Sequence, residues 1–373
     1  CTEAFLFRFI IDLKLFYLLV LMNFALLALY NRVRVSKSLL FIYLYLLLSG
    51  ILSVALGTNQ AIKVFAQFFG IFFISLYFYN FYKLFNLDVL KIFKGYVSLC
   101  FVIALVGYPL LVYNLTIGDG LLFHSILNEP AHYCTFVLPA FYYSLKNREF
   151  PRYIFVILLV SILLSGSSLG LIGVALSMLL MPRRIKFSKL ILPVIICIIG
   201  ITALYNFYSG FKIRADDTFK SLKENDLSGA NLSTYALLSN LYVTSKSLSN
   251  NPLLGSGLGS HELSHKRYIG GVEGIEAFEQ NLFLNSKDAN SLLLRVLSDL
   301  GLIGAFGLAI FIFRNYPKNN VDGNMLYVSR AILIYFFCKL LREGHYFSPE
   351  MYFFVFAYLF INKVNYPVII NER

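Results

Sequence analysis

Charged side chains are scarce in this chain, since Asp, Glu, Lys and Arg make up 14% of its 373 residues, against roughly 25% in an average soluble protein. Tryptophan is absent, and the five cysteines show neither paired spacing nor a Cys-x-x-Cys metal motif. This composition excludes an ordinary soluble domain and a scaffold held together by disulfides. We interpret the cysteines within apolar runs as small hydrophobic residues, and we expect neither a metal nor another cofactor.

Hydrophobic residues make up 58% of the chain, and its mean hydropathy is +0.70. Apolar runs of about 17 to 25 residues recur from end to end, and a helix of that length crosses a hydrocarbon core. Because the alternation typical of outer-membrane strands is missing, the spans must be helices. We predict an all-α polytopic membrane protein with about eleven spans. These lie near 9–30, 38–56, 61–82, 95–115, 130–146, 153–165, 167–181, 189–208, 291–313, 325–341 and 350–363.

The formal net charge of +12 comes from Lys and Arg in short loops between the spans, so it indicates topology and not nucleic acid binding. Every second loop is basic, namely 32–37, 83–94, 146–152, 183–189 and 314–318. By the positive-inside rule these loops face the cytoplasm, which places the C-terminus inside and residue 1 outside. The chain opens with Cys1 almost inside an apolar run. The question whether a further helix precedes it in the natural chain therefore stays open.

This topology divides the chain into an N-terminal transmembrane segment (1–208), a large extracytoplasmic segment (209–290) and a C-terminal transmembrane segment (291–373). The middle segment has the chain's only extended polar composition, and we predict an amphipathic helix in it from about 233 to 248. All five histidines fall on or near the outer face: His124, His132, His261, His265 and His345. We therefore expect any chemistry to take place on the extracytoplasmic face, beneath segment 209–290.

Two short motifs on that face combine acids with imidazoles. Glu129 precedes a proline that can start a helix, and His132 follows three residues later, so both can act on a hydroxyl nucleophile. The alternative is a capping carboxylate and an ordinary interfacial histidine. Residues 342–346 read Arg-Glu-Gly-His-Tyr, in which Arg342 and His345 form a compact polar cluster. An arginine at this depth either faces a partner or cavity, or extends to the headgroups.

The span at 291–313 carries Arg295 and Asp299, four residues apart on one helical face, where they can form an ion pair. Their presence in an apolar helix indicates an inward-facing site, and the alternative is a purely structural salt bridge. Gly301, Gly304 and Gly307 further along this span indicate close helix packing. The glycine loop 251–259 before it lacks the Gly-x-Gly-x-x-Gly spacing of a nucleotide site. It can offer backbone N–H groups to a phosphate or form a flexible turn.

Together these motifs resemble the O-antigen polymerase and ligase family. The resemblance rests on Asn-Glu-Pro-Ala-His at 128–132, Ser-Gly-Ser-Ser at 165–168, the glycine loop 251–259 and Ser-Asp-Leu-Gly-Leu-Ile-Gly at 298–304. Residues 342–346 and the Ser-Thr-Tyr at 233–235 look most like Wzy-type polymerases of O-antigen or capsule repeat units. The resemblance covers most of the chain after about residue 125. Ala289-Asn290 stands where ligases of the family carry His-Asn, which favours a polymerase over a ligase.

The resemblance implies a GT-C-like, metal-independent glycosyltransferase at the periplasmic face of the bacterial inner membrane. Its substrates would be undecaprenyl-pyrophosphate-linked oligosaccharides as donor and acceptor, with a chain-length regulator and a flippase as partners. Arg214, Arg295 and Arg342 would neutralise pyrophosphate, Glu129, His132 and His345 are the candidate bases, and Gly257, His261 and Tyr346 would contact substrate. The alternatives are an O-antigen ligase and a flippase or transporter for lipid-linked oligosaccharide. A transporter would favour internal repeats, and we find none.

Overall fold

The structure of the protein, a computed structural model, describes residues 6–8, 12–30, 33–84, 88–117, 122–127, 129–180, 209–224, 226–317 and 323–361, and a few residues between 195 and 206. Most of these residues are helical. Two three-residue strands near the start, β1 (Leu6–Arg8) and β2 (Asp12–Lys14), pair in antiparallel fashion. The prediction that the first span begins near residue 9 is therefore wrong, because residues 12–14 are extended and the first helix begins at Leu15.

The helices follow the predicted spans closely. In chain order they are α1 (Leu15–Leu29), α2 (Lys37–Ala55), α3 (Ala61–Leu84), α4 (Val89–Ile117), α5 (Pro130–Lys146), α6 (Arg152–Leu164) and α7 (Ser168–Leu179), and, near the end, α12 (Leu292–Arg314), α13 (Gly323–Leu341) and α14 (Pro349–Ile361). Most of the predicted span at 189–208 lies outside the described residues. Five of the described helices, α2, α3, α4, α12 and α13, are long and apolar enough to cross a membrane. The chain is thus a helical protein with membrane-spanning character, and the number of eleven spans stays a prediction.

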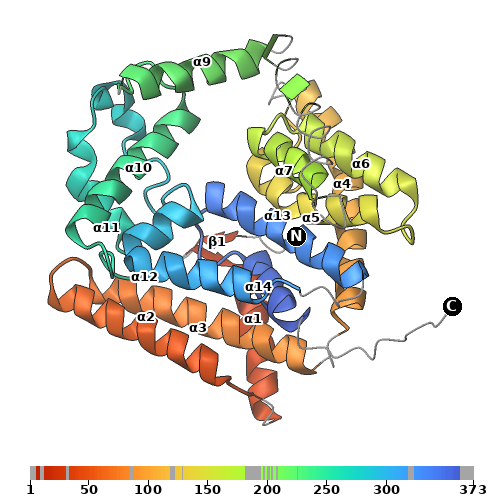
Figure 1. The fold of residues 1–373 in the computed structure, drawn as a ribbon, viewed down its shortest axis with the longest axis horizontal. Helices are drawn as coiled ribbons and strands as arrows, with labels where there is room; N and C mark the ends of the chain where they lie inside the picture. Colours follow the sequence, from red (N-terminus) through yellow and green to blue (C-terminus); the bar gives the residue numbers. More distant parts are fainter. Residues whose placement is uncertain are drawn as a thin grey trace.

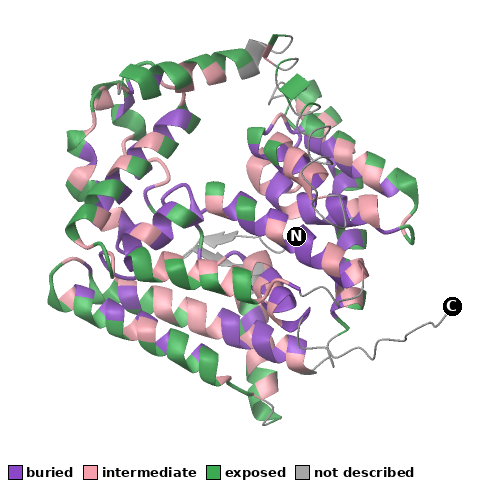
Figure 2. Ribbon diagram, in the orientation of Figure 1, coloured by how far each residue is buried: buried purple, intermediate pink, exposed green. Residues whose placement is uncertain are grey.

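Helix α13 lies at the centre of the molecule, in contact with α4, α5, α7, α12 and α14 (Figure 1). In the most apolar stretch of α13, 61% is buried inside the protein. The corresponding value for the other four long helices is 22 to 33%. Figure 2 shows the same pattern, with buried residues concentrated in α5 and α13. Because α13 is surrounded by other helices and not by lipid, it can carry charged side chains that find partners inside the protein.

Segment 209–290 forms a partly helical unit beside α12. It contains α9 (Ser209–Glu224), α10 (Leu232–Asn250), α11 (His261–Tyr268) and two short 3-10 helices, η2 (Ile269–Gly271) and η3 (Ile275–Asn281). Helix α10 confirms the predicted amphipathic helix, and Asn231 caps it by accepting from the Thr234 amide at 3.1 Å. Helices α10 and α11 contact each other and α12, whereas α9 is exposed along most of its length (Figures 1 and 2).

Helix α12 is broken at Gly301, whose backbone is left-handed (φ +62°). The glycine loop 251–259 enters this break and supplies the missing backbone hydrogen bonds. The amides of Ser256 and Gly257 donate to the carbonyls of residues 298 and 299 at 2.8 and 2.9 Å, and the amides of residues 302 and 303 donate to those of residues 252 and 253 at 2.9 and 3.1 Å. Gly301 therefore forms a helix break, and the prediction that it serves close helix packing did not include this. Gly307 has no neighbour within 4 Å of the position that a Cβ atom would take, so it makes no close packing contact within the described residues.

Candidate functional site

A buried ion-pair cluster lies where α5, α13 and α14 meet the loop after α13. The Lys339 ammonium is 1% exposed and lies 2.6 Å from a Glu343 oxygen and 3.4 Å from a Glu350 oxygen. The other Glu343 oxygen lies 3.8 Å from Nε2 of His132, which projects from the first turn of α5. We call Lys339, Glu343, Glu350 and His132 the carboxylate cluster. Three of its residues lie within 339–350 and the fourth lies in α5, far away in the sequence, so its geometry depends on the tertiary fold.

The backbone around Glu343 is under strain. Ala289, Asn290 and Glu343 all adopt left-handed conformations, with φ of +58°, +59° and +65°. The Glu343 amide donates to the Asn290 carbonyl at 3.0 Å, and the next residue, Gly344, packs so closely on the Asp288 carbonyl that no side chain would fit. Non-glycine residues in this region cost about 1–3 kcal/mol each and persist where the surroundings hold them, often at functional sites.

The charges of the carboxylate cluster leave His132 paired and accessible. Burial raises the pKa of the Glu343 carboxyl, but Lys339 and His132 lower it by more, so the pKa lies below its usual value and the group is ionised. The His132 side chain is 39% exposed. At 3.8 Å from the ring the Glu343 oxygen is not hydrogen-bonded to it, but a carboxylate this close stabilises the imidazolium that forms when the ring accepts a proton from a hydroxyl.

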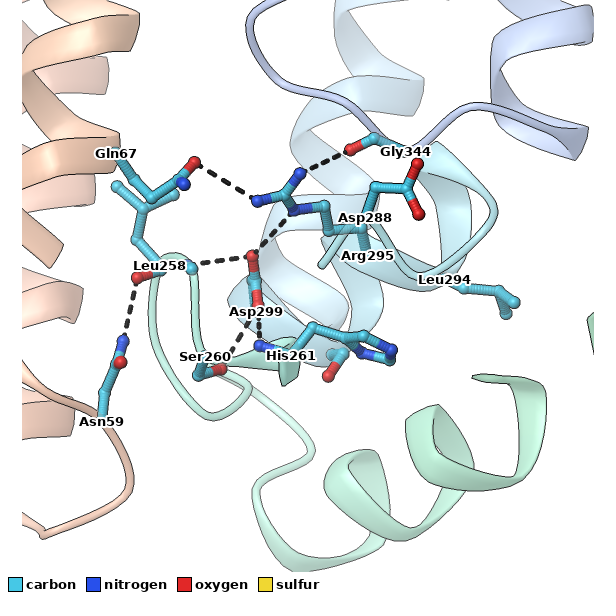
Figure 3. A network of polar contacts seen from close by, with 12 residues as sticks. Asn59, Gln67, Leu258, Ser260, His261, Asp288, Leu294, Arg295, Asp299 and Gly344 are labelled. Atoms are coloured by element: carbon cyan, nitrogen blue, oxygen red, sulfur yellow. Dashed lines mark hydrogen bonds and ion pairs between the residues drawn. The ribbon is translucent and has the colours of Figure 1, made fainter. Parts of the chain in front are cut away.

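A second cluster surrounds Arg295 on α12 (Figure 3). Its Nη1 donates to the Gly344 carbonyl at 2.9 Å, its Nη2 donates to Gln67 of α3 at 3.3 Å, and its Nε lies 3.6 Å from an Asp299 oxygen. The guanidinium carbon lies 4.1 Å from the centroid of the Tyr346 ring. The predicted Arg295–Asp299 pair is confirmed. Because Arg295 is 3% exposed and its Nη1 and Nη2 donate within the protein, it anchors residues 344–346 to α12 and is not accessible to a phosphate.

Asp299 also fixes the start of α11. Its carboxylate accepts from the backbone amides of Gly259 and His261 at 3.0 and 2.9 Å and from the Ser260 hydroxyl at 3.2 Å (Figure 3). A carboxylate at this position caps the helix and complements its dipole. The Arg295–Asp299 pair therefore joins segment 209–290 to the loop that carries Glu343.

The structure places the remaining predicted residues in three settings. Glu129, the residue before α5, is exposed and caps nothing, His345 is exposed, and Arg342 is partly exposed. None of the ion pairs between described residues involves Arg342. The side chain of Arg214, on α9, lies outside the described residues. The structure thus places His132 beside Glu343, in the loop that also carries Arg342 and His345. Three other residues have structural partners: Gly257, His261 and Tyr346.

Those three residues are buried or used within the fold, which changes their predicted roles. The Gly257 amide donates to a backbone carbonyl of α12, and a side chain at position 257 would collide with Ser53. His261 is 1% exposed and bonds Asn240 at 2.9 Å. Tyr346 is 5% exposed beneath Arg295, so its ring does not face a sugar. The predicted substrate contacts of these three residues are not seen in this conformation.

Sequence reasoning missed Lys339 and the partners of Glu343. The available signal was a lone lysine in an apolar helix, four residues before a glutamate, because an intramembrane charge is costly without a partner. It also passed over residues 261–265, His-Glu-Leu-Ser-His, which match a helical zinc-binding spacing. Within the described residues, no group of three or more His, Cys, Asp or Glu is arranged to hold a metal ion.

Comparisons with known proteins identify no matching family model and no curated relative. The resemblance to the O-antigen polymerase and ligase family therefore rests on the motifs of the sequence, and the functional argument rests on the geometry of the site.

Proposed function

We propose that the protein is a polymerase of lipid-linked oligosaccharide repeat units, a GT-C-like glycosyltransferase of the Wzy type. It would act at the periplasmic face of the bacterial inner membrane on undecaprenyl-pyrophosphate-linked donor and acceptor. The observation that carries the proposal is the partly exposed His132 backed by the buried Glu343, next in sequence to Arg342. A base and a cation at one loop are what transfer from a pyrophosphate leaving group to a hydroxyl requires.

In the proposed reaction, His132 acts as the base. Glu343 lies on the Nε2 side of the ring, so Nδ1 faces away from it and takes the proton from the acceptor hydroxyl. The acceptor oxygen then forms a bond to the anomeric carbon of the donor as the bond from that carbon to the pyrophosphate oxygen breaks. The pyrophosphate lipid leaves with the electron pair, and Arg342 stabilises its charge through forked hydrogen bonds.

Positioning supports the same assignment. The Arg295–Asp299 pair and the ion pair between Lys339 and Glu343 both hold the loop 342–346. Preorganised groups contribute more to a transition state than groups that must first be ordered. Glu129 and His345 remain exposed and close in sequence to the two parts of the site, so they are second candidates for contacts with the acceptor.

The test is incubation of purified protein with defined lipid-linked repeat units, followed by electrophoresis. We expect a ladder from the unaltered chain. We expect His132→Ala to slow it by about 10²–10⁴-fold, the usual contribution of a general base, and Arg342→Ala to abolish it without lowering the amount of protein in the membrane. His124→Ala and Arg267→Ala are matched controls, because both residues lie on the same predicted face outside the site.

Each alternative gives a different result. A flippase would leave the repeat units unchanged in detergent, and a ligase would transfer a unit to a separate lipid acceptor without lengthening it. A normal ladder from His132→Ala would remove His132 from the mechanism, and the absence of a ladder from the unaltered chain would refute the polymerase.

A further inference from the structure

Helix α11 opens with the sequence His-Glu-Leu-Ser-His at 261–265. Two histidines four residues apart lie on one helical face, which is the spacing that helical zinc sites use. The glutamate between them serves another purpose, because Glu262 lies 2.8 Å from Lys63 and 3.1 Å from Lys266. Its hydrogen bond with Lys63 is the main cause that lowers the pKa of this carboxyl. The motif therefore does not supply the general base of a metalloprotease.

Both histidines are buried with ring nitrogens that lack partners. His261 is 1% exposed and His265 is 0% exposed. Nδ1 of His261 and both ring nitrogens of His265 have no hydrogen-bond partner among the described residues. Leaving a buried polar group unsatisfied costs about 1–3 kcal/mol, so each such group calls for a bound water or ion. Three of these nitrogens in one helical turn form the densest group of this kind in the described part of segment 209–290.

Asn240 on α10 sets the tautomer of His261. The Asn240 amide nitrogen donates to the carbonyls of residues 236 and 284 at 2.6 and 3.3 Å, so its oxygen is the acceptor that faces His261. Nε2 of His261 lies 2.9 Å from that oxygen and must carry the hydrogen. The lone pair then lies on the unpartnered Nδ1. Metal-binding histidines are held in this way, with the other ring nitrogen donating to a fixed acceptor.

The two rings lie close together. Their centroids lie 6.2 Å apart. The rings lie one helical turn apart on α11, and three of their four nitrogens lack partners. Arg295 is a neighbouring cation, and the Asp299 carboxylate beside Arg295 offsets its charge.

We propose that His261, through Nδ1, and His265 bind one divalent transition-metal ion of the kind that prefers imidazole, with Zn²⁺ as the expected ion. No third protein ligand of the usual kinds is placed for it among the described residues, so water completes the coordination. Phe283, whose ring centroid lies 5.9 Å from that of His265, is 47% exposed. The ion would bridge one turn of α11, which carries both ligands, independently of the proposed polymerase reaction.

The test uses the full chain purified in detergent without a polyhistidine tag, stripped with EDTA and titrated with Co²⁺ as the probe. We expect one equivalent of Co²⁺ with the visible absorption of nitrogen-bound cobalt, displaced by Zn²⁺. His265→Gln should lose this equivalent. Asn240→Ala should weaken binding by about 10–100-fold, as removal of a group that orients a ligand does. His124→Gln is the matched control and should bind Co²⁺ as the unaltered chain does.

A second measurement does not depend on the folding of a variant. Zn²⁺ should raise the thermal unfolding temperature of the unaltered chain in proportion to its binding, because a ligand that binds only the native state stabilises it. No Co²⁺ uptake by the unaltered chain, or full uptake by His265→Gln, would overturn the proposal and leave a bound water as the partner of these nitrogens.

Discussion

Replacing Lys339 with methionine tests whether the carboxylate cluster holds the core together. Lys339 neutralises Glu343 and Glu350, at 2.6 and 3.4 Å, and all three lie inside the protein. Removing one partner of a buried pair leaves an uncompensated charge and costs about 3–5 kcal/mol. Lys339→Met leaves two carboxylates without their cation, so we expect a loss in this range. Glu343→Gln leaves Lys339 paired with Glu350, and we expect a smaller loss of about 1–3 kcal/mol.

The double variant makes the prediction sharper. When Lys339→Met and Glu343→Gln are combined, the loss of unfolding free energy should be smaller than the sum of the two single losses by about 0.5–3 kcal/mol. The reason is that each single change leaves the other partner with one fewer opposite charge. The matched control is Lys94→Met. Lys94 pairs with Glu149 at the surface, where both side chains are at least one-third exposed, and such pairs contribute about 0–1 kcal/mol.

The assay can use the protein's own cysteines. Cys100, Cys134 and Cys338 are buried and free, so a thiol-reactive dye reports their exposure as detergent-solubilised protein is heated. At roughly 2 °C per kcal/mol for a chain of this size, Lys339→Met should lower the unfolding temperature by about 6–10 °C. A Lys339→Met protein as stable as the Lys94→Met control, or less affected than Glu343→Gln, would refute the reasoning.

Two further predictions use the same assay. Gly301→Ala places a side chain at φ +62° with its first carbon 2.5 Å from the Leu253 carbonyl oxygen, so we expect a loss of at least about 2 kcal/mol, whereas Gly307→Ala, with open space around it, should not destabilise. The pH dependence follows from His261 and His265, whose pKa values burial lowers to about 3 and about 4. Because the unfolded chain takes up their protons near pH 6.5, stability is complete above that pH and falls below it by about 1.4 kcal/mol per unit for each histidine. An unfolding temperature that stays constant between pH 7.5 and 5 would contradict this.

The features that sequence reasoning predicted correctly are local ones. The lengths of the apolar runs located α2, α3, α12 and α13 to within a few residues, because a span needs a fixed number of apolar residues whatever lies beside it. The four-residue spacing placed Arg295 and Asp299 on one face. The amphipathic pattern of residues 233–248 located α10. None of these inferences requires knowledge of a distant part of the chain.

The features that it missed depend on partners far away in sequence. His132 and Glu343 are separated by 211 positions yet lie 3.8 Å apart. Gly301 resembles a packing glycine until residues 252–257 are known to occupy its break. His261 resembles a substrate ligand until Asn240 is seen to bind its ring. A pattern in one segment identifies which residues are unusual, and only the tertiary fold decides whether they face substrate or protein.

The insertion of the glycine loop into α12 limits how this protein can be rebuilt. Four backbone hydrogen bonds cross between residues 252–257 and residues 298–303, and backbone groups inside a protein are costly to leave unpaired. Segment 209–290 is therefore not an exchangeable module, and a chimera that takes it from another chain must take a matching α12 with it. During synthesis the glycine loop is made before α12, so the loop can form hydrogen bonds with the break in α12 as soon as that helix is made.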